Sequence, residues 1–200
     1  EARKILSRTF GSGAFGSVEA SGSGTLSPVG ASGSRAIGEA EGLALAEAFG
    51  IRAVPRRLCP GVEEVITAAG ELGYPVVLKV SSPEIFHKTE LGLVSEGLSD
   101  EASLRAAFSS LSKNLRRANL KEVDGYLVQR LIRGGEEFLV GMVRDPQVGA
   151  LITAAVGGAA AEAMGDVSVR LAPVSRGEAD AMLNELRGAR LLDAFRGRGP

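Results

Sequence analysis

The chain has 200 residues, of which 44% are hydrophobic and 24% charged, the composition of a globular protein with room for one domain or two small lobes. A net charge of −1 gives no reason to expect a nucleic-acid partner or an anionic membrane. The single cysteine, Cys59, excludes an internal disulfide and suits the reducing cytoplasm. The chain has no cluster of cysteines and histidines, which excludes a structural zinc site.

The first 34 residues differ in composition from the rest of the chain. Between Gly11 and Ser34, 14 of 24 residues are glycine or serine. Such a segment buries too little apolar surface to offset the entropy of ordering it, so residues 1–34 are expected to form a flexible linker. Linkers of this kind join modules, which suggests that the chain is tethered to something upstream.

The folded part is expected to begin near Glu39 and to combine helices with short strands. Helical spacing of apolar residues predicts helices near 43–49, at 62–72 and at 101–117, and Asp100 is expected to cap the last of these. Short apolar runs predict strands at 76–78 and 93–98, with an extended segment at 51–58.

The second half is richer in strands. Alternating apolar residues predict strands at 125–132, 137–143, 148–156 and 167–171, and a final amphipathic helix at 179–192. The first two of these strands are expected to be joined as in a hairpin through Arg133-Gly134-Gly135, and Asp145-Pro146 is expected to open a turn. The apolar run 148–164 is interrupted by two glycines, so a strand and a turn explain it better than a membrane helix. The pattern is α+β, with helices flanking mostly antiparallel strands.

The stretch 74–94 carries the most informative chemistry. Lys79 lies within an apolar run, where an ammonium group is costly unless an anion meets it. His87 lies in a loop bounded by Pro83 and Gly92, and this loop could carry a titrating or phosphorylatable group between two places. The alternative is a lysine whose head reaches solvent and a surface histidine without a role.

Several segments, in order, resemble one family. GIRAVP, a helix and GYPVVLKVSSPEIFHKTELG are similar to the ATP-grasp domain of the NDP-forming acyl-CoA synthetases, the acetate–CoA ligase (ADP-forming) family. YLVQRLIRGGEEFLVGMVRDPQVG, VGGAAAEAMGDVSVRLAPV and LLDAFRGRGP are similar to the later motifs of that family. The resemblance runs from about Glu39 to Pro200.

The resemblance implies an ATP-grasp fold: two α+β lobes with antiparallel sheets, at 39–119 and 120–200, and a nucleotide cleft between them. The family continues beyond the last residue of this chain to a strand that completes its Mg²⁺ site, so the second lobe is expected to be incomplete. Its CoA-binding and acyl-handling domains or subunit would be further partners, which makes this chain part of a larger enzyme.

The same resemblance implies roles for individual residues. Nucleotide binding is implied for Lys79, at the phosphates, for Gln129, near the adenine, and for Glu137, Gly157, Gly158 and Arg170. Glu162 and Asp166 would hold Mg²⁺, because hard cations prefer carboxylate oxygens. If their segment is helical, Glu162, Asp166 and Arg170 share one face. The simpler alternatives are a solvated ion-pair ladder for these three residues and a plain turn at the two glycines.

His87 receives the catalytic role from the resemblance, as a transiently phosphorylated residue in the HKT sequence. The implied reaction is acid + CoA + ATP ⇌ acyl-CoA + ADP + phosphate, through an acyl phosphate and phosphohistidine. A relay needs motion, so the loop 81–92 is expected to make few backbone hydrogen bonds to the core. A regulatory domain without catalysis, for example in a protein acetyltransferase fusion, and an ATP-grasp carboxylate ligase without a histidine relay remain alternatives. The acid and the choice between ATP and GTP stay open.

Overall fold

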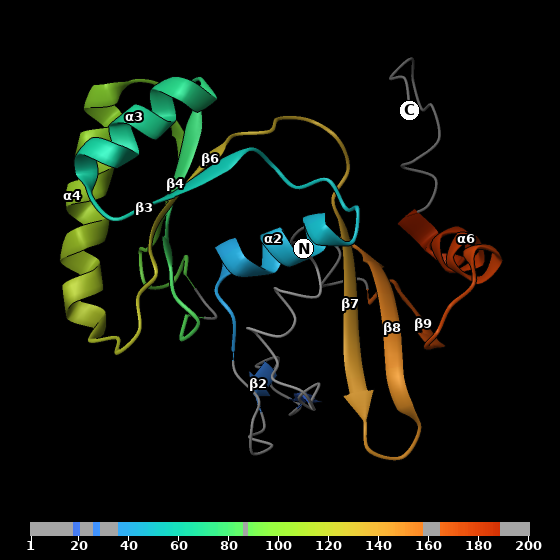
Figure 1. Ribbon diagram of the computed structural model, residues 1–200. Coiled ribbons are helices and arrows are strands. Elements are labelled where there is room, and N and C mark those ends of the chain that lie inside the picture. Colours follow the sequence, from blue (N-terminus) through green and yellow to red (C-terminus); the bar gives the residue numbers. More distant parts are fainter. Residues whose placement is uncertain (1–17, 21–25, 29–35, 86–87, 158–164, 189–200) are drawn as a thin grey trace. The chain divides into compact units, whose positions relative to one another are not determined.

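The computed structural model describes residues 18–20, 26–28, 36–85, 88–157 and 165–188. The chain divides into two compact units. The described residues 36–85 and 88–133 belong to the first unit, and 18–20, 26–28, 134–157 and 165–188 belong to the second. Figure 1 labels their helices and strands.

The first unit contains a four-stranded antiparallel sheet in the order β3 (Arg56–Cys59), β6 (Gly125–Arg130), β4 (Val76–Ser81), β5 (Val94–Leu98). Two helices pack on it: α3 (Val62–Leu72) on β3 and β6, and α4 (Glu101–Ala118) on β4 and β5 (Figure 1). Strand β4 is central and buried except at Lys79, which is why its sequence is a nearly continuous apolar run.

One face of this sheet forms the core with α3 and α4. The core includes Val76, Leu78, Val80, Tyr126 and Val128 from the strands, together with Val65, Ala69, Leu104 and Leu111 from the helices. The predicted cap at Asp100 is confirmed, because its carboxylate accepts a hydrogen bond from the Ser103 N–H at 2.7 Å. The predicted helix at 62–72 is also confirmed.

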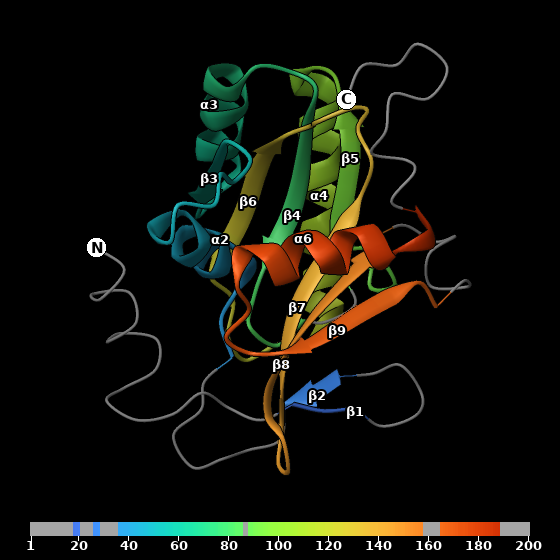
Figure 2. The same cartoon turned by 90° about the vertical axis from the view of Figure 1, so that its right-hand side faces the viewer.

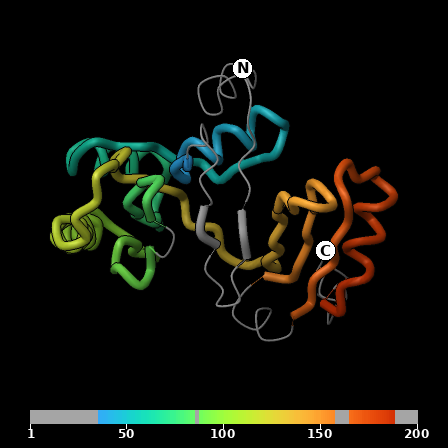
Figure 3. Tube along the Cα trace, turned by 90° about the horizontal axis from the view of Figure 1, so that it is seen from below, coloured from blue at the N-terminus to red at the C-terminus, as the bar shows by residue number. Residues whose placement is uncertain are grey.

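The second unit has a three-stranded antiparallel sheet in the order β7 (Phe138–Asp145), β8 (Gly149–Val156), β9 (Val167–Leu171). Helix α6 (Arg176–Glu185) packs on β8 and β9, as Figure 2 shows, and the succession from β7 to α6 can be followed in Figure 3. As predicted, Asp145 opens the turn between β7 and β8, where its carboxylate accepts from the N–H groups of Gln147 and Val148.

Some expectations about the elements differ from the structure. The hairpin predicted through Arg133–Gly135 is wrong, because β6 pairs with β3 and β4 whereas β7 pairs with β8. Since β6 pairs with β3 and β4, the first compact unit extends to Arg133, and the expected division into lobes at 39–119 and 120–200 stays a prediction. Helix α6 begins at Arg176 rather than at 179, since Ser175 and Glu178 form a capping box at its start.

The segment expected to be a linker has two described parts. Strands β1 (Val18–Ala20) and β2 (Leu26–Pro28) pair antiparallel, and the remainder of 1–35 lies outside the described residues. Within the described part of the chain, no helix has both the length and the apolar character that crossing a membrane requires.

Leu78→Ala tests the core of the first unit. The Leu78 side chain is fully buried in the central strand, so its truncation leaves a cavity and should lower the free energy of unfolding by about 2–5 kcal/mol. Leu58→Ala is the control, because Leu58 is 46% exposed on an edge strand and its loss should cost much less. Urea denaturation followed by circular dichroism measures both, and equal effects would contradict this description of the core.

Candidate functional site

Three polar side chains of the first unit meet at the carboxylate of a fourth residue, Glu39. Lys79 Nζ lies 2.9 Å from Glu39 Oε1, and Lys88 Nζ lies 2.5 Å from Glu39 Oε2. Gln129 Nε2 donates to Glu39 Oε1 at 3.2 Å. These residues come from four separate segments of the chain, so the cluster exists only in the folded unit.

The pairing register explains why two of these residues share a face. Lys79 on β4 pairs with Leu127 on β6, so these two side chains project to the same side of the sheet. Gln129 is two residues after Leu127 on β6 and therefore projects to that side as well. The neighbouring positions 78 and 128 project to the side that α3 and α4 cover. One face of the sheet therefore forms the core, and the other face presents polar groups toward α2 (Glu39–Ala48).

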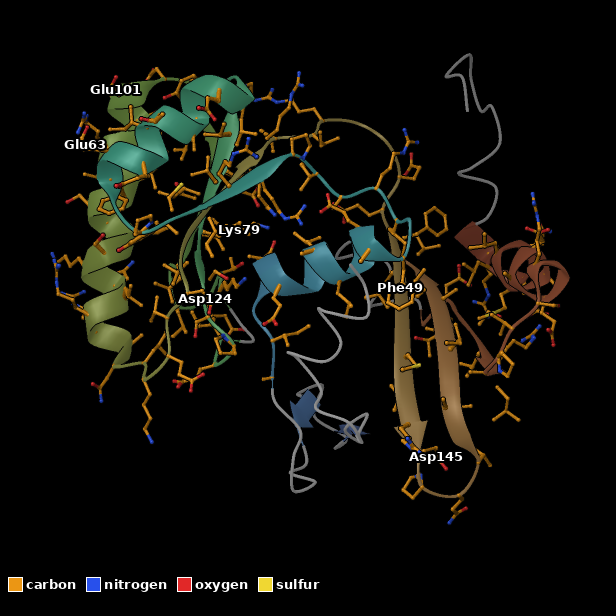
Figure 4. All side chains as sticks on the ribbon, viewed as in Figure 1. Phe49, Glu63, Lys79, Glu101, Asp124 and Asp145 are labelled. Carbon is orange, nitrogen blue, oxygen red and sulfur yellow. The ribbon has the colours of Figure 1, made fainter. Side chains whose placement is uncertain are left out.

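The glycine that precedes α2 lets Glu39 lie close to Lys79 and Gln129. Gly38 precedes α2, and a Cβ atom at this position would lie 2.2 Å from Asp124 Oδ2 and 3.1 Å from Ser81 Oγ. Glycine therefore lets the helix start lie close to the ends of β4 and β6. Figure 4 shows the Lys79 side chain extending from β4 toward the start of α2.

The segment before Lys88 is anchored to the chain that precedes β6. Ser81 Oγ donates to Asp124 Oδ2 at 3.0 Å, and Ser82 Oγ donates to the Glu122 carbonyl at 2.6 Å. The Glu84 carboxylate accepts from the N–H groups of Lys121 and Glu122.

The segment after Lys88 is anchored as well. Gly92 lies next to α4, because its carbonyl accepts from Asn114 Nδ2 at 3.0 Å. The Leu93 N–H donates to the Lys88 carbonyl at 2.9 Å, and the Val80 N–H donates to the Leu93 carbonyl at 2.9 Å. The expectation of few backbone hydrogen bonds between the loop 81–92 and the core stays a prediction. Side chains make several of the bonds that anchor the described residues, and apart from the bond between Lys88 and Leu93, backbone bonds to the rest of the unit lie at the two ends, at the carbonyls of Ser81 and Gly92.

The carboxylate of Glu39 is ionised at neutral pH. Burial alone would raise the pKa of Glu39, but hydrogen bonds from Lys79 and Lys88, and their positive charges, lower it below its ordinary value. The three side chains are only partly buried, with exposures of 25% for Glu39, 22% for Lys79 and 16% for Lys88. A dissolved anion could therefore reach the two ammonium groups.

A pocket of about 440 Å³ opens beside this cluster, within the size range of small-molecule sites. Its described lining residues are Glu39, Lys79, Ile85, Lys88, Thr89, Glu90, Val94 and Glu96. Lys79 and Lys88 are the cations among them. Two primary amines that converge at one point suit phosphate oxygens, which accept charge-assisted hydrogen bonds as carboxylates do.

A second pocket, of about 410 Å³, lies at β3 and α3 and has a different character. Cys59 lines it, but burial raises the pKa of this thiol and keeps it protonated at neutral pH. Glu63, Glu64 and Glu71 also line this pocket, against one cation, Arg57, among the described lining residues. It is the poorer candidate for a phosphate.

In the second unit, the described candidates bond within their own unit. Asp166 accepts from the N–H groups of Arg187 and Gly188 at 2.9 and 2.8 Å, and the bonds from Gly188 and Arg187 lower the pKa of Asp166. Arg170 pairs with Glu185. Since Arg170 lies on strand β9, the helical face suggested for it and Asp166 does not form.

Gly157 and Glu137 are in direct contact. The Gly157 N–H donates to the Glu137 carbonyl at 2.6 Å, and a Cβ atom on Gly157 would lie 2.8 Å from Glu137 Cβ. The glycine is thus required by packing, whatever else it contacts. His87, Gly158 and Glu162 lie outside the described residues, and the residues that are described contain no group of three acidic, histidine or cysteine side chains suited to a metal ion.

Sequence reasoning found Lys79 and Gln129 but missed Glu39 and assigned nothing to Lys88. The lysine in an apolar run signalled the need for an anion, yet the anion is 40 residues away in the chain. No local pattern marks Glu39 as that partner, because a glutamate in the first turn of a helix is ordinary.

Gly157→Ala tests whether packing alone requires this glycine. The added methyl group would press on the backbone and Cβ of Glu137, so the free energy of unfolding should fall by about 1–3 kcal/mol. Gly177→Ala in α6 is the control, because a Cβ atom there meets nothing within 4 Å and should be neutral or stabilising. Thermal unfolding measures both variants. An unchanged Gly157→Ala protein would show that this close contact does not constrain the residue.

Comparison with known proteins gives a consistent result. The family profile described as ATP-grasp domain matches residues 29–200. Acetate–CoA ligase (ADP-forming) I of Archaeoglobus fulgidus is 41% identical over 169 residues, which are 84% of this chain and 24% of that protein. The β subunit of acetate–CoA ligase (ADP-forming) I of Pyrococcus furiosus is 34% identical over 169 residues, covering 83% of this chain and 72% of the subunit.

Solved structures agree. The dinucleotide forming acetyl-coenzyme A synthetase 1 of Ca. Korarchaeum cryptofilum, in complex with coenzyme A, Ca-AMPCP and HgCl+, matches with a TM-score of 0.77 and 35% identity over 84% of this chain and 74% of that chain. Its structure with coenzyme A and Mg-AMPPCP, which has a phosphohistidine segment pointing towards the nucleotide binding site, matches with a TM-score of 0.67 and 34% identity over 81% and 69%. The chain therefore has the ATP-grasp fold and belongs to the ATP-grasp domain family, in the form found in ADP-forming acyl-CoA synthetases.

Proposed function

We propose that the pocket beside β4 binds the phosphate groups of a nucleotide and that the chain performs the nucleotide step of an ADP-forming acyl-CoA synthesis. The observation that carries this proposal is the convergence of Lys79 and Lys88 on one carboxylate in a pocket of about 440 Å³. A lysine on a central strand is costly without an anion, and a bound phosphate would provide a strong one.

The proposed reaction has three transfers. A ring nitrogen of His87 attacks the terminal phosphorus of the nucleoside triphosphate, and the bond to the diphosphate breaks. The phosphoryl group then passes to the carboxylate of an organic acid, which gives an acyl phosphate and frees His87. The thiolate of CoA attacks the acyl carbon and releases phosphate. Imidazole suits the relay because it is nucleophilic near neutral pH.

Relatives support this sequence of steps. The archaeal synthetase binds coenzyme A and Mg-AMPPCP, and its phosphohistidine segment points towards the nucleotide binding site. His87, the single histidine of this chain, is the proposed counterpart of that phosphohistidine. The chain spans 24% of the A. fulgidus ligase, so CoA-binding and acyl-handling domains or a separate subunit are the proposed partners, in the cytoplasm.

The described residues do not, as they stand, form a Mg²⁺ site at Asp166. Its carboxylate oxygens accept from the backbone N–H groups of Arg187 and Gly188, and the described residues offer no group of three acidic, histidine or cysteine side chains that could hold a metal ion with it. Glu162, the second proposed ligand, lies outside the described residues. We therefore derive no step through a metal ion, and the proposal concerns the lysines and His87.

Lys79→Ala tests the phosphate site. Loss of one charge-assisted contact should weaken binding of Mg·ATP or Mg·ADP by about 1.5–3 kcal/mol, or about tenfold to a hundredfold. Lys113→Ala is the control, since Lys113 is an exposed lysine on α4 that does not line the pocket. Calorimetry at constant ionic strength measures both. Tight binding that Lys79→Ala leaves unchanged would place the nucleotide elsewhere.

His87→Ala tests the relay. In the protein with all its partner domains, the variant should keep its nucleotide affinity but lose acyl-CoA synthesis, because no other histidine of this chain can replace it. With γ-³²P-ATP, the unmodified protein should acquire an acid-labile, base-stable label that the variant lacks. Lys113→Ala should label normally. Activity that survives in His87→Ala would mean direct phosphorylation of the acid, and a protein without ADP-forming activity would favour a regulatory role.

A further inference from the structure

The two ammonium groups of the phosphate site are already occupied in the structure. Glu39 uses both of its oxygens, one for Lys79 and one for Lys88, and it also accepts from Gln129. We propose that Glu39 is the resident counter-ion of this site, and that a phosphate group binds only as Glu39 releases the two lysines. This inference rests on the proposed function and adds an internal competitor to it.

The Glu39 carboxylate and a phosphate group are chemically similar, so they would compete for the two lysines. A carboxylate and a phosphate group both present oxygens that accept hydrogen bonds from more than one cationic donor. The position that Glu39 takes between the lysines is therefore the one that a phosphate would take. An ammonium group has three donors, but holding both anions at once would bring two negative charges side by side in a partly buried site.

The charges along the pocket strengthen the argument. Besides Glu39, the residues Glu90 and Glu96 line it. While Glu39 is in place, its carboxylate lies between the two ammonium groups and would repel a phosphate that approached them. Once the Glu39 carboxylate has moved away, this repulsion falls and the lysines are free to bind.

Because of its position in α2, Glu39 can release the two lysines without disturbing the rest of the helix. Glu39 is the first residue of α2, and no residue of this helix is buried. Moving a terminal residue disturbs one turn, whereas moving a mid-helix residue would break the hydrogen bonds on both sides. The same movement also releases the amide of Gln129 from Glu39, and it frees both lysines that line the pocket.

The test uses inorganic pyrophosphate as the probe and calorimetry at constant ionic strength. Glu39→Gln keeps the shape of the side chain but removes its charge, and it should bind pyrophosphate about tenfold more tightly than the unmodified protein. Glu47→Gln is the matched control. It lies on the same helix and pairs with Arg56 outside the pocket, so the affinity should not change. Equal or weaker binding by Glu39→Gln would overturn the inference.

Two further variants distinguish a wrong role for Glu39 from a wrong assignment of the phosphate site. Glu39→Asp keeps a negative charge in the first helical turn but is too short to bridge both lysines, so it should also bind more tightly and replaces Glu39→Gln if that variant does not fold. Lys79→Met should weaken pyrophosphate binding by about tenfold to a hundredfold, because one of the two ammonium groups is lost. Pyrophosphate binding that depends on Lys79 but not on Glu39 would refute the counter-ion alone. No binding by any protein in the series would refute the phosphate site itself.

Discussion

An ammonium group on the central strand of a sheet needs an anion, and the first unit is built around that need. Strand β4 is buried at every position except Lys79, and the buried positions 76, 78 and 80 face the core under α3 and α4. The opposite face also buries Val77 and Leu127, and it carries the polar residues Lys79 and Gln129. Glu39 supplies the anion there, and with it the start of α2 is attached to the sheet.

The two faces of this sheet have different roles, one in stability and the other in the proposed binding of an anion. Apolar side chains on the helix-covered face contribute most of the stability, because burial of aliphatic groups is the main favourable term in folding. Ion pairs on the other face are partly exposed, so they add little stability and can exchange partners at small cost. A binding site that must lose one anion to gain another benefits from weak, accessible pairs.

Local signals in the sequence predicted local structure well and long-range pairing poorly. The helix at Val62–Leu72 and the cap at Asp100 follow from spacing and from one side chain, and both are present. The hairpin predicted at Arg133–Gly135 was wrong because alternating apolar residues indicate a strand but not the strand with which it pairs. Strand β6 pairs with β3 and β4. Glu39 was missed for the same reason, since its partners are set by the fold rather than by spacing.

The second unit shows why a residue pattern alone does not assign a role. Asp166, Arg170 and Gly157 fit the motif of the family, yet in this structure each is engaged by its own unit, with backbone N–H groups, with Glu185 and with Glu137. In the first unit Lys79 is also fully engaged, but by a carboxylate at the edge of a pocket, which a phosphate resembles. An internal partner that mimics the ligand supports a binding role, whereas a backbone partner at a packed turn supports a structural one. By that criterion we place the proposed chemistry of this chain at β4 and the start of α2.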